Sequence, residues 1–114
     1  MPYAMTAHSV FSNIDRERPV TISPLLVSKI IREHIGIKGL FITDDICMSA
    51  LDGAIVERAQ ASLFAGCDLV LHCSGILSEM QDLTQEIQRM GESGWEKAQV
   101  MQEFYKRKIC YYKL

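Results

Sequence analysis

Two adjacent carboxylates, Asp44 and Asp45, closely follow a run of large apolar residues, Leu40 to Ile42. A carboxylate at the end of such a run can act as a nucleophile, a general base or a metal ligand, or it can belong to a solvated acidic turn. Successive residues of a strand point to opposite faces, so both side chains cannot enter one pocket unless the chain has already turned into a loop. The sequence therefore predicts one aspartate that carries the chemistry and one that supports it.

Two histidines follow other apolar runs. His8 comes after the first run and His72 after the third. A histidine beside a carboxylate can transfer protons or bind hydroxyl groups, but a structural or incidental position is equally open for each of them. His34 falls within a predicted helix, where we expect a structural or exposed position.

The elements around these residues alternate between short apolar runs and amphipathic segments, which indicates an α/β protein. Ser23 is a suitable N-cap and Pro24 suits the first helical position, while Gly36 and Gly66 are suitable helix ends. The first helix should bury one face, formed by Leu26, Val27, Ile30, Ile31 and Ile35. The remaining predicted elements are strands at 3–7, 40–42 and 68–71, and helices at 54–65, 76–90 and from Gly94 and Trp95 onward.

Strands joined by single helices lie parallel, so their carboxyl ends share one edge of the sheet. The candidate residues at that edge are His8, Asp44, Asp45, His72 and Ser74. Ligands of parallel α/β proteins bind at this edge, because its loops can vary while the strands hold them in place. The sequence predicts a site there.

The composition excludes several classes of function. The chain has 114 residues, 48% of them hydrophobic, and a net charge of −2, which fits one globular domain and gives no basic field for nucleic acid. No apolar run approaches the roughly 20 residues of a membrane helix, and the amino terminus lacks the order of a signal peptide. We therefore expect a cytoplasmic protein without a membrane or nucleic-acid partner.

The four cysteines form no C-x-x-C pair and have no spacing typical of zinc. We expect free thiols, no metal and no cofactor, with Cys67 and Cys73 as small buried hydrophobes beside a strand. Trp95 is expected to be packed, and the basic residues 106–108 to form a solvated helix end.

Several motifs occur in an order that resembles the second half of the catalytic barrel of glycoside hydrolase family 3, and most of all its bacterial β-N-acetylglucosaminidases of peptidoglycan recycling. They are MTAHSVF, IDRERPVTISP, IREHIGIKG, LFITDDICMSAL and AGCDLVLHC. The resemblance implies the last three βα units of a (β/α)8 barrel of the triosephosphate isomerase type. It assigns residues 1–92 to a partial catalytic domain and 93–114 to a C-terminal helix with a divergent tail.

The resemblance also implies roles for individual residues. The first acid of the family's (Ser/Thr)-Asp-Asp motif is the nucleophile, which corresponds to Asp44, with Asp45 as its structural neighbour. His8, Met48 and Asp45 would line a site for a terminal β-linked N-acetylglucosamine. The expected reaction retains configuration through a covalent glycosyl-enzyme, and it needs no cofactor.

The chain departs from the family pattern in two ways. A complete barrel has eight units, so three strands leave two open edges. The family's general acid/base is a histidine, assisted by an aspartate, in an upstream Lys-His-Phe-Pro-Gly-His-Gly type segment that this sequence does not contain. We expect little activity from this chain alone, and we interpret it as a truncated or split enzyme whose partner is the missing first half of the barrel.

Two other classes of protein are compatible with parts of the pattern. A non-catalytic α/β module that binds a sugar or a partner is the main alternative. The chain is part of an enzyme if a separate chain supplies the missing acid/base, and it is at most a binding module if none does. A phospho-receiver domain also places paired acids at a strand end. Its acidic pair would follow the first strand and a lysine would follow a later one, and neither feature occurs here.

Overall fold

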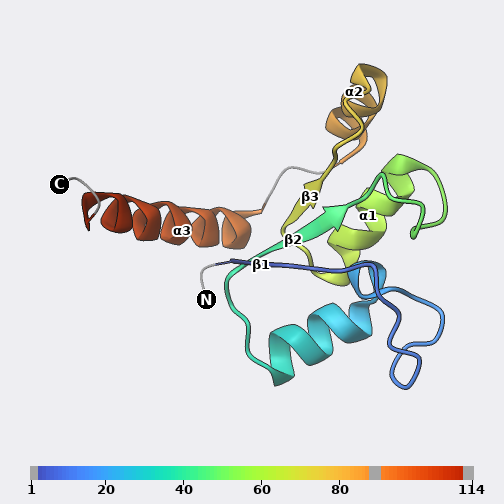
Figure 1. Cartoon of the computed structure of the whole chain (residues 1–114), viewed down its shortest axis with the longest axis horizontal. Coiled ribbons are helices and arrows are strands. Elements are labelled where there is room, and N and C mark those ends of the chain that lie inside the picture. Colours follow the sequence, from blue (N-terminus) through green and yellow to red (C-terminus); the bar gives the residue numbers. More distant parts are fainter. Residues whose placement is uncertain (1–2, 88–90, 112–114) are drawn as a thin grey trace.

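The computed structural model describes residues 3–87 and 91–111, with the side chains of 107–111 left out, and its centre is a parallel sheet with the strand order β1-β2-β3 (Figure 1). The strands are β1 (Tyr3–Met5), β2 (Leu40–Asp45) and β3 (Leu69–Leu71). The predicted α/β class and the parallel strands are confirmed. The outer strands are shorter than the predicted ranges 3–7 and 68–71, and β2 is longer, because it includes both aspartates.

An irregularity in β2 lies directly before the carboxylates. Ile42 pairs with Leu69 and Asp45 with Leu71, so β2 has one residue more than β3 between these pairs. The hydroxyl of the buried Thr43 accepts the Leu71 N–H at 2.8 Å in place of a backbone carbonyl. Such bulges bend a strand and redirect its side chains. The bulge therefore lies in the segment that carries Asp44 and changes the direction of the strand just before Asp45.

The segment between β1 and β2 contains a 3-10 turn, η1 (Val20–Ile22), and a π-helix, η2 (Leu25–His34). Ser23 caps this helix as predicted, because its hydroxyl accepts the Leu26 N–H at 3.2 Å. The predicted apolar face is wrong at Ile35, which is 61% exposed. Its N–H bonds to the Ile30 carbonyl at 2.8 Å, five residues back, and this wider winding turns Ile35 away from the face that a 3.6-residue period predicts.

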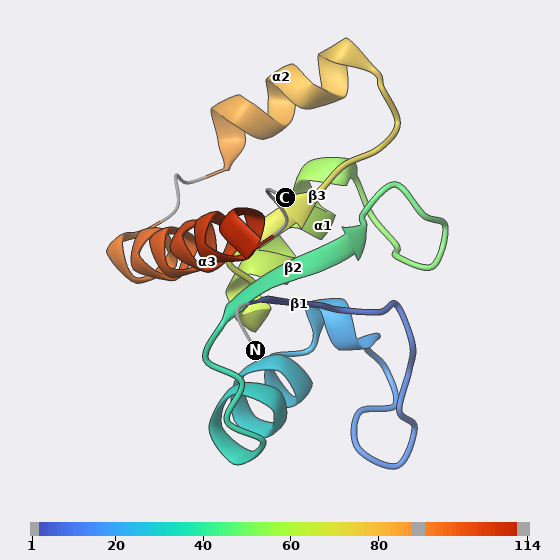
Figure 2. The same cartoon turned by 60° about the vertical axis from the view of Figure 1, so that its left-hand side comes forward.

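Three further helices follow: α1 (Ile55–Ala65), α2 (Leu77–Glu86) and α3 (Glu92–Tyr111). Gly66 ends α1 with φ of 116°, and a Cβ there would lie 2.6 Å from the Ser28 hydroxyl, so glycine is required. The predicted third helix extended to residue 90, but α2 ends at Glu86 and residues 88–90 lie outside the described range. In Figure 2, α3 lies in front of the strands and α1 behind them.

Two apolar clusters form the core. The first joins β2, η2 and α1 through Val20, Leu26, Val27, Phe41, Ala65 and Cys67. The second centres on Ile46, Leu51 and Ala59 and lies under the loop that follows β2. In the first cluster, burial raises the pKa of the Cys67 thiol to about 12, which fits the predicted role of a small hydrophobe. The second cluster therefore supports the segment directly after the two aspartates.

Asp68, directly before β3, joins three elements. One carboxylate oxygen accepts from Arg32 Nη2 of η2 at 2.6 Å and from the Phe41 N–H at 2.8 Å, and the other accepts from Lys97 Nζ of α3 at 2.8 Å. The side chains of Asp68 and Arg32 are only 11% and 16% exposed. Arg32 also lies over the Phe41 ring and donates to the Gly39 carbonyl. This junction fixes the start of the sheet, opposite the predicted site.

The Asp68 junction predicts a dependence of stability on acid. Burial acts to raise the pKa of Asp68, but the hydrogen bonds from Lys97, the Phe41 N–H and Arg32 outweigh it and lower that pKa below its usual value. A lowered folded pKa means that the ionised group stabilises the fold above pH about 4 and that this contribution is lost as the pH falls through the folded value. We expect the free energy of unfolding to fall more steeply below pH about 4 in the wild type than in Asp68→Asn, measured by urea unfolding. Parallel curves for the two proteins would contradict the assignment.

Two expectations about side-chain burial are wrong. Trp95 is 62% exposed, and Cys73 is exposed because the chain has already left β3 at that point. His34 is exposed and Lys106 pairs with Glu103 at the surface, as expected. The rest of the basic run and the side chain of Cys110 lie outside the described side chains. Within the described ranges, no helix has both the length and the apolar character that crossing a membrane requires.

Candidate active site

The carboxyl edge of the sheet brings together the segments that the sequence placed there. Asp45 Oδ1 accepts the N–H of Cys47 at 3.0 Å and the N–H of Cys73 at 3.1 Å. The hydrogen bond from the Cys47 N–H is the main cause that lowers the pKa of Asp45, with burial acting against it. Asp45 thus holds the loop after β2 against the segment after β3.

Asp44 occupies a different environment from its neighbour. Its N–H donates to Thr6 Oγ1 at 3.1 Å, and its Oδ1 accepts the Asp45 N–H at 2.9 Å. Within the described residues, no group donates a hydrogen bond to Asp44 Oδ2. The half-buried side chain is therefore fixed through Oδ1, while Oδ2 has no hydrogen-bond partner among the described residues.

His8 is positioned by contacts on both sides of its ring. Nε2 lies 2.8 Å from the Asp45 carbonyl oxygen, which can only accept, so this nitrogen carries a proton. Nδ1 lies 2.8 Å from the Thr21 hydroxyl, which lies 2.8 Å from the Thr6 hydroxyl. The backbone on both sides of the Asp44 peptide is thus held by one hydrogen-bond network. Both ring nitrogens of His8 are engaged within the protein.

Thr21 is the central member of this network and predicts a measurable loss of stability. The residue is fully buried, and its hydroxyl contacts Thr6, His8 and the Ala7 carbonyl. Thr21→Val keeps the shape but leaves these groups without a partner, so we expect a loss of about 1–3 kcal/mol in the free energy of unfolding. Urea unfolding checks it. The matched control is Thr84→Val, which removes an exposed hydroxyl that donates to the Gln81 carbonyl, and an equal effect of both substitutions would contradict the assigned role.

Met48 lies in the loop between β2 and α1 and is 45% exposed. Its N–H donates to the Asp45 carbonyl at 3.2 Å, so the loop turns immediately after the aspartates. Arg58 of α1 holds the same loop in place, because it donates to the carbonyls of Ile46, Met48 and Gly53. Met48 is therefore a surface side chain on a supported loop beside Asp44.

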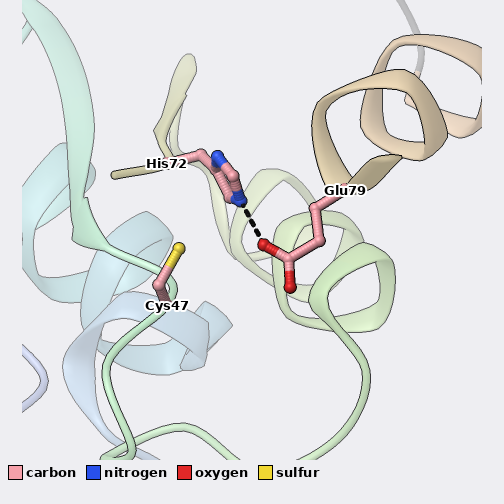
Figure 3. Close-up of side chains that lie close together, drawn as sticks. All are labelled: Cys47, His72 and Glu79. Atoms are coloured by element: carbon pink, nitrogen blue, oxygen red, sulfur yellow. Dashed lines mark hydrogen bonds and ion pairs between the residues drawn. The ribbon is translucent and has the colours of Figure 1, made fainter. Parts of the chain in front are cut away.

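His72 points towards α2. Its Nε2 lies 2.8 Å from Glu79 Oε2, and Ser74 Oγ donates to the same carboxylate oxygen at 2.5 Å (Figure 3). The His72 side chain is 8% exposed, and its Nδ1 is buried without a hydrogen-bond partner in the described part of the chain. Cys47 lies beside this pair. Neither His8 nor His72 therefore presents an exposed, unengaged ring nitrogen at this edge of the sheet.

Sequence reasoning missed several residues that build this edge. Thr6 and Thr21 belong to the quoted motifs MTAHSVF and IDRERPVTISP, but a hydroxyl in a strand or turn carries no signal of its partner. Arg58 and Glu79 occupy ordinary helix positions. Their roles depend on which loop packs against each helix, and no local pattern reveals that.

Comparison with known proteins gives the family. The sequence matches the glycosyl hydrolase family 3 N-terminal domain over residues 2–106. A β-hexosaminidase of Bordetella pertussis is 40% identical over 81 residues, which is 69% of this chain and 23% of that protein. The native structure of the enzyme NagZ from Neisseria gonorrhoeae is 30% identical with a TM-score of 0.74, over 89% of this chain and 28% of that one.

The same Neisseria protein has been solved in complex with N-trifluoroacetyl-D-glucosamine, and this structure matches at 32% identity with a TM-score of 0.70, over 83% of this chain and 26% of that one. The chain spans about a quarter of the length of the relatives it matches. The family domain matches nearly the whole sequence, including the motifs that form the carboxyl edge of the sheet. The chain belongs to glycosyl hydrolase family 3, and the relatives reported above are bacterial proteins of that kind, a β-hexosaminidase and NagZ.

Proposed function

We propose that this chain supplies the nucleophile for hydrolysis of terminal, non-reducing β-linked N-acetylglucosamine, and that Asp44 is that nucleophile. The observation that carries the proposal is the asymmetry of the two carboxylates. Asp45 is bound to two backbone N–H groups, whereas Asp44 is held through one oxygen and keeps Oδ2 available. The substrate class comes from the β-hexosaminidases that the chain is similar to.

The proposed reaction proceeds in two steps. Asp44 Oδ2 attacks the anomeric carbon, the glycosidic bond breaks, and the leaving oxygen takes up a proton. Water then attacks the anomeric carbon of the glycosyl-enzyme, loses a proton and releases the sugar with its original configuration. His8 and the threonine network hold the Asp44 backbone, and Met48 and Asp45 lie where they can border the sugar.

Among the described residues, neither histidine at this edge of the sheet is free to supply the proton. His8 is engaged at both ring nitrogens, and His72 is buried against Glu79. General acid/base assistance typically contributes about 10²–10⁴-fold in rate. We propose that the acid/base comes from barrel units that this sequence does not contain, so that these residues alone have little or no activity.

We further propose that β1, β2 and β3 are the last strands of a (β/α)8 barrel. A parallel sheet with the strand order β1-β2-β3 and polar residues at its carboxyl edge supports this placement. The division into residues 1–92 and a tail of 93–114 also belongs to the proposal, as do a cytoplasmic location and a role in peptidoglycan recycling. A sugar-binding module without catalysis is the competing hypothesis.

The test is release of nitrophenol from para-nitrophenyl β-N-acetylglucosaminide. The assay compares the purified chain, a separately produced first barrel half from the Neisseria relative, and their mixture, with complex formation followed by size-exclusion chromatography. We expect turnover only in the mixture. Turnover by the chain alone would contradict the need for an upstream acid, and a stable complex without turnover would favour the binding module.

A further inference from the structure

We propose that Cys47, His72 and Glu79 form a binding site for a Zn²⁺ ion beside the nucleophile. The three residues come from the loop after β2, the end of β3 and helix α2. Their donor atoms, one sulfur, one nitrogen and one oxygen, all lie within 4.8 Å of one another. Figure 3 shows the Cys47 thiol and the Glu79 carboxylate both directed towards the ring of His72.

The donor set selects the metal. Zn²⁺ is bound by thiolate sulfur at about 2.3 Å, imidazole nitrogen at about 2.0–2.1 Å and carboxylate oxygen at about 2.0–2.2 Å. Donors that share one ion in tetrahedral geometry lie about 3.3–3.7 Å apart. The observed cluster needs only small side-chain movements to reach these separations. A thiolate disfavours Mg²⁺ and Ca²⁺, which take oxygen ligands, and three protein ligands leave the fourth position to water.

The surroundings make the donors available. His72 Nε2 binds the ion only when the ring proton lies on Nδ1, so the coordinate bond to the ion replaces the present hydrogen bond from Nε2 to Glu79 Oε2. The Ser74 hydroxyl donates to Glu79 Oε2 and so holds the carboxylate in place beside His72. On binding, the Cys47 thiol releases its proton to water and bonds to the ion as a thiolate. The negative charges of Glu79 within the cluster and of Asp45, which accepts the Cys47 N–H, favour a divalent cation.

The ion would add a tie between three segments, the loop after β2, the end of β3 and helix α2. Helix α2 has no fully buried residue: Leu83 packs at the margin of the Ile46, Leu51 and Ala59 cluster, and Glu79 is its polar contact with the segment after β3, through His72 and Ser74. A bound ion would join α2 to the loop that carries Met48 through its coordinate bonds to Glu79 and Cys47. We therefore expect Zn²⁺ to raise the melting temperature of the chain.

The test uses Co²⁺ as a spectroscopic replacement for Zn²⁺ in the full chain. The expected result is one equivalent of Co²⁺ with the absorption of a tetrahedral, thiolate-bound ion, displaced by Zn²⁺. Cys47→Ser should abolish the thiolate band, and His72→Gln and Glu79→Gln should weaken binding by more than the roughly 10–100-fold typical of outer-shell partners. The matched control is Cys73→Ser, an exposed thiol on the neighbouring segment, which should keep both band and affinity.

Circular dichroism of each variant separates loss of the site from loss of the fold. Glu79→Gln replaces a side chain that is 32% exposed, so this variant should remain folded and still bind weakly. Unchanged affinity in a folded Glu79→Gln, a band that persists in Cys47→Ser, or no binding by the folded wild type would each overturn the proposal. None of these measurements depends on glycosidase activity, so the site and the proposed function fail or stand separately.

Discussion

Replacement of Asp44 by Asn should reduce the glycosidase activity of the assembled barrel by on the order of 10³-fold or more. Asn has the same shape and keeps the hydrogen bond to the Asp45 N–H, but its amide is a poor nucleophile for an anomeric carbon. The loss should be in kcat, because ground-state binding of the sugar does not require the carboxylate charge. The measurement is steady-state kinetics of the mixture with para-nitrophenyl β-N-acetylglucosaminide.

The matched control is Asp52→Asn, which removes one negative charge from the exposed end of the same loop. We expect its kcat and KM to remain within a few-fold of those of the wild type, because Asp52 does not reach the strand end. If Asp44→Asn retains most of the activity, or if both substitutions have the same effect, Asp44 is not the nucleophile.

The second large effect concerns stability. Asp68→Ala should lower the free energy of unfolding by about 3 kcal/mol, because it leaves Arg32 and the Phe41 N–H without their shared acceptor. Net stabilities of whole domains are only about 5–15 kcal/mol, so the loss is a large part of what holds a small unit together. Urea unfolding followed by circular dichroism measures it.

Two variants define the cause of this loss. Glu33→Ala breaks the pair with Lys29, whose side chains are 61% and 66% exposed, and should cost less than about 0.5 kcal/mol. Asp68→Asn keeps an acceptor for the Phe41 N–H and should fall between the two. Equal losses for Asp68→Ala and Glu33→Ala would show that the junction at the start of β3 does not stabilise the fold.

The parallel sheet and its functional edge could be predicted because their signals are local. Unbroken apolar runs such as Leu40 to Ile42 identify buried strands, and Gly66 ends a helix where the chain needs a positive φ. Parallel connection then places His8 and Asp45 at the same edge, where the His8 ring bonds to the Asp45 carbonyl. The chemistry of Asp44 was assigned by family resemblance.

The remaining features depend on packing between distant segments. A bulge inside β2 and the wide winding of η2 arise from how the strand and helix fit their neighbours, so a regular period misplaced Ile35. Glu79 reaches His72 only because α2 folds back over the sheet edge, so spacing alone gave no reason to expect a metal-binding cluster. Trp95 is exposed because it lies on a part of α3 that no other described element covers.

The central claim, that Asp44 forms the covalent glycosyl-enzyme, is tested most directly by mass spectrometry. The mixture of this chain and the upstream half, with the acid/base histidine of the upstream half replaced by alanine, is treated with dinitrophenyl β-N-acetylglucosaminide. This leaving group needs no proton, while release of the sugar still needs a base, so the intermediate should accumulate. We predict one N-acetylhexosaminyl group on this chain, located on Asp44 by peptide fragmentation and absent from Asp44→Asn. A sugar attached to any other residue, or product release without a labelled chain, would contradict the proposed mechanism.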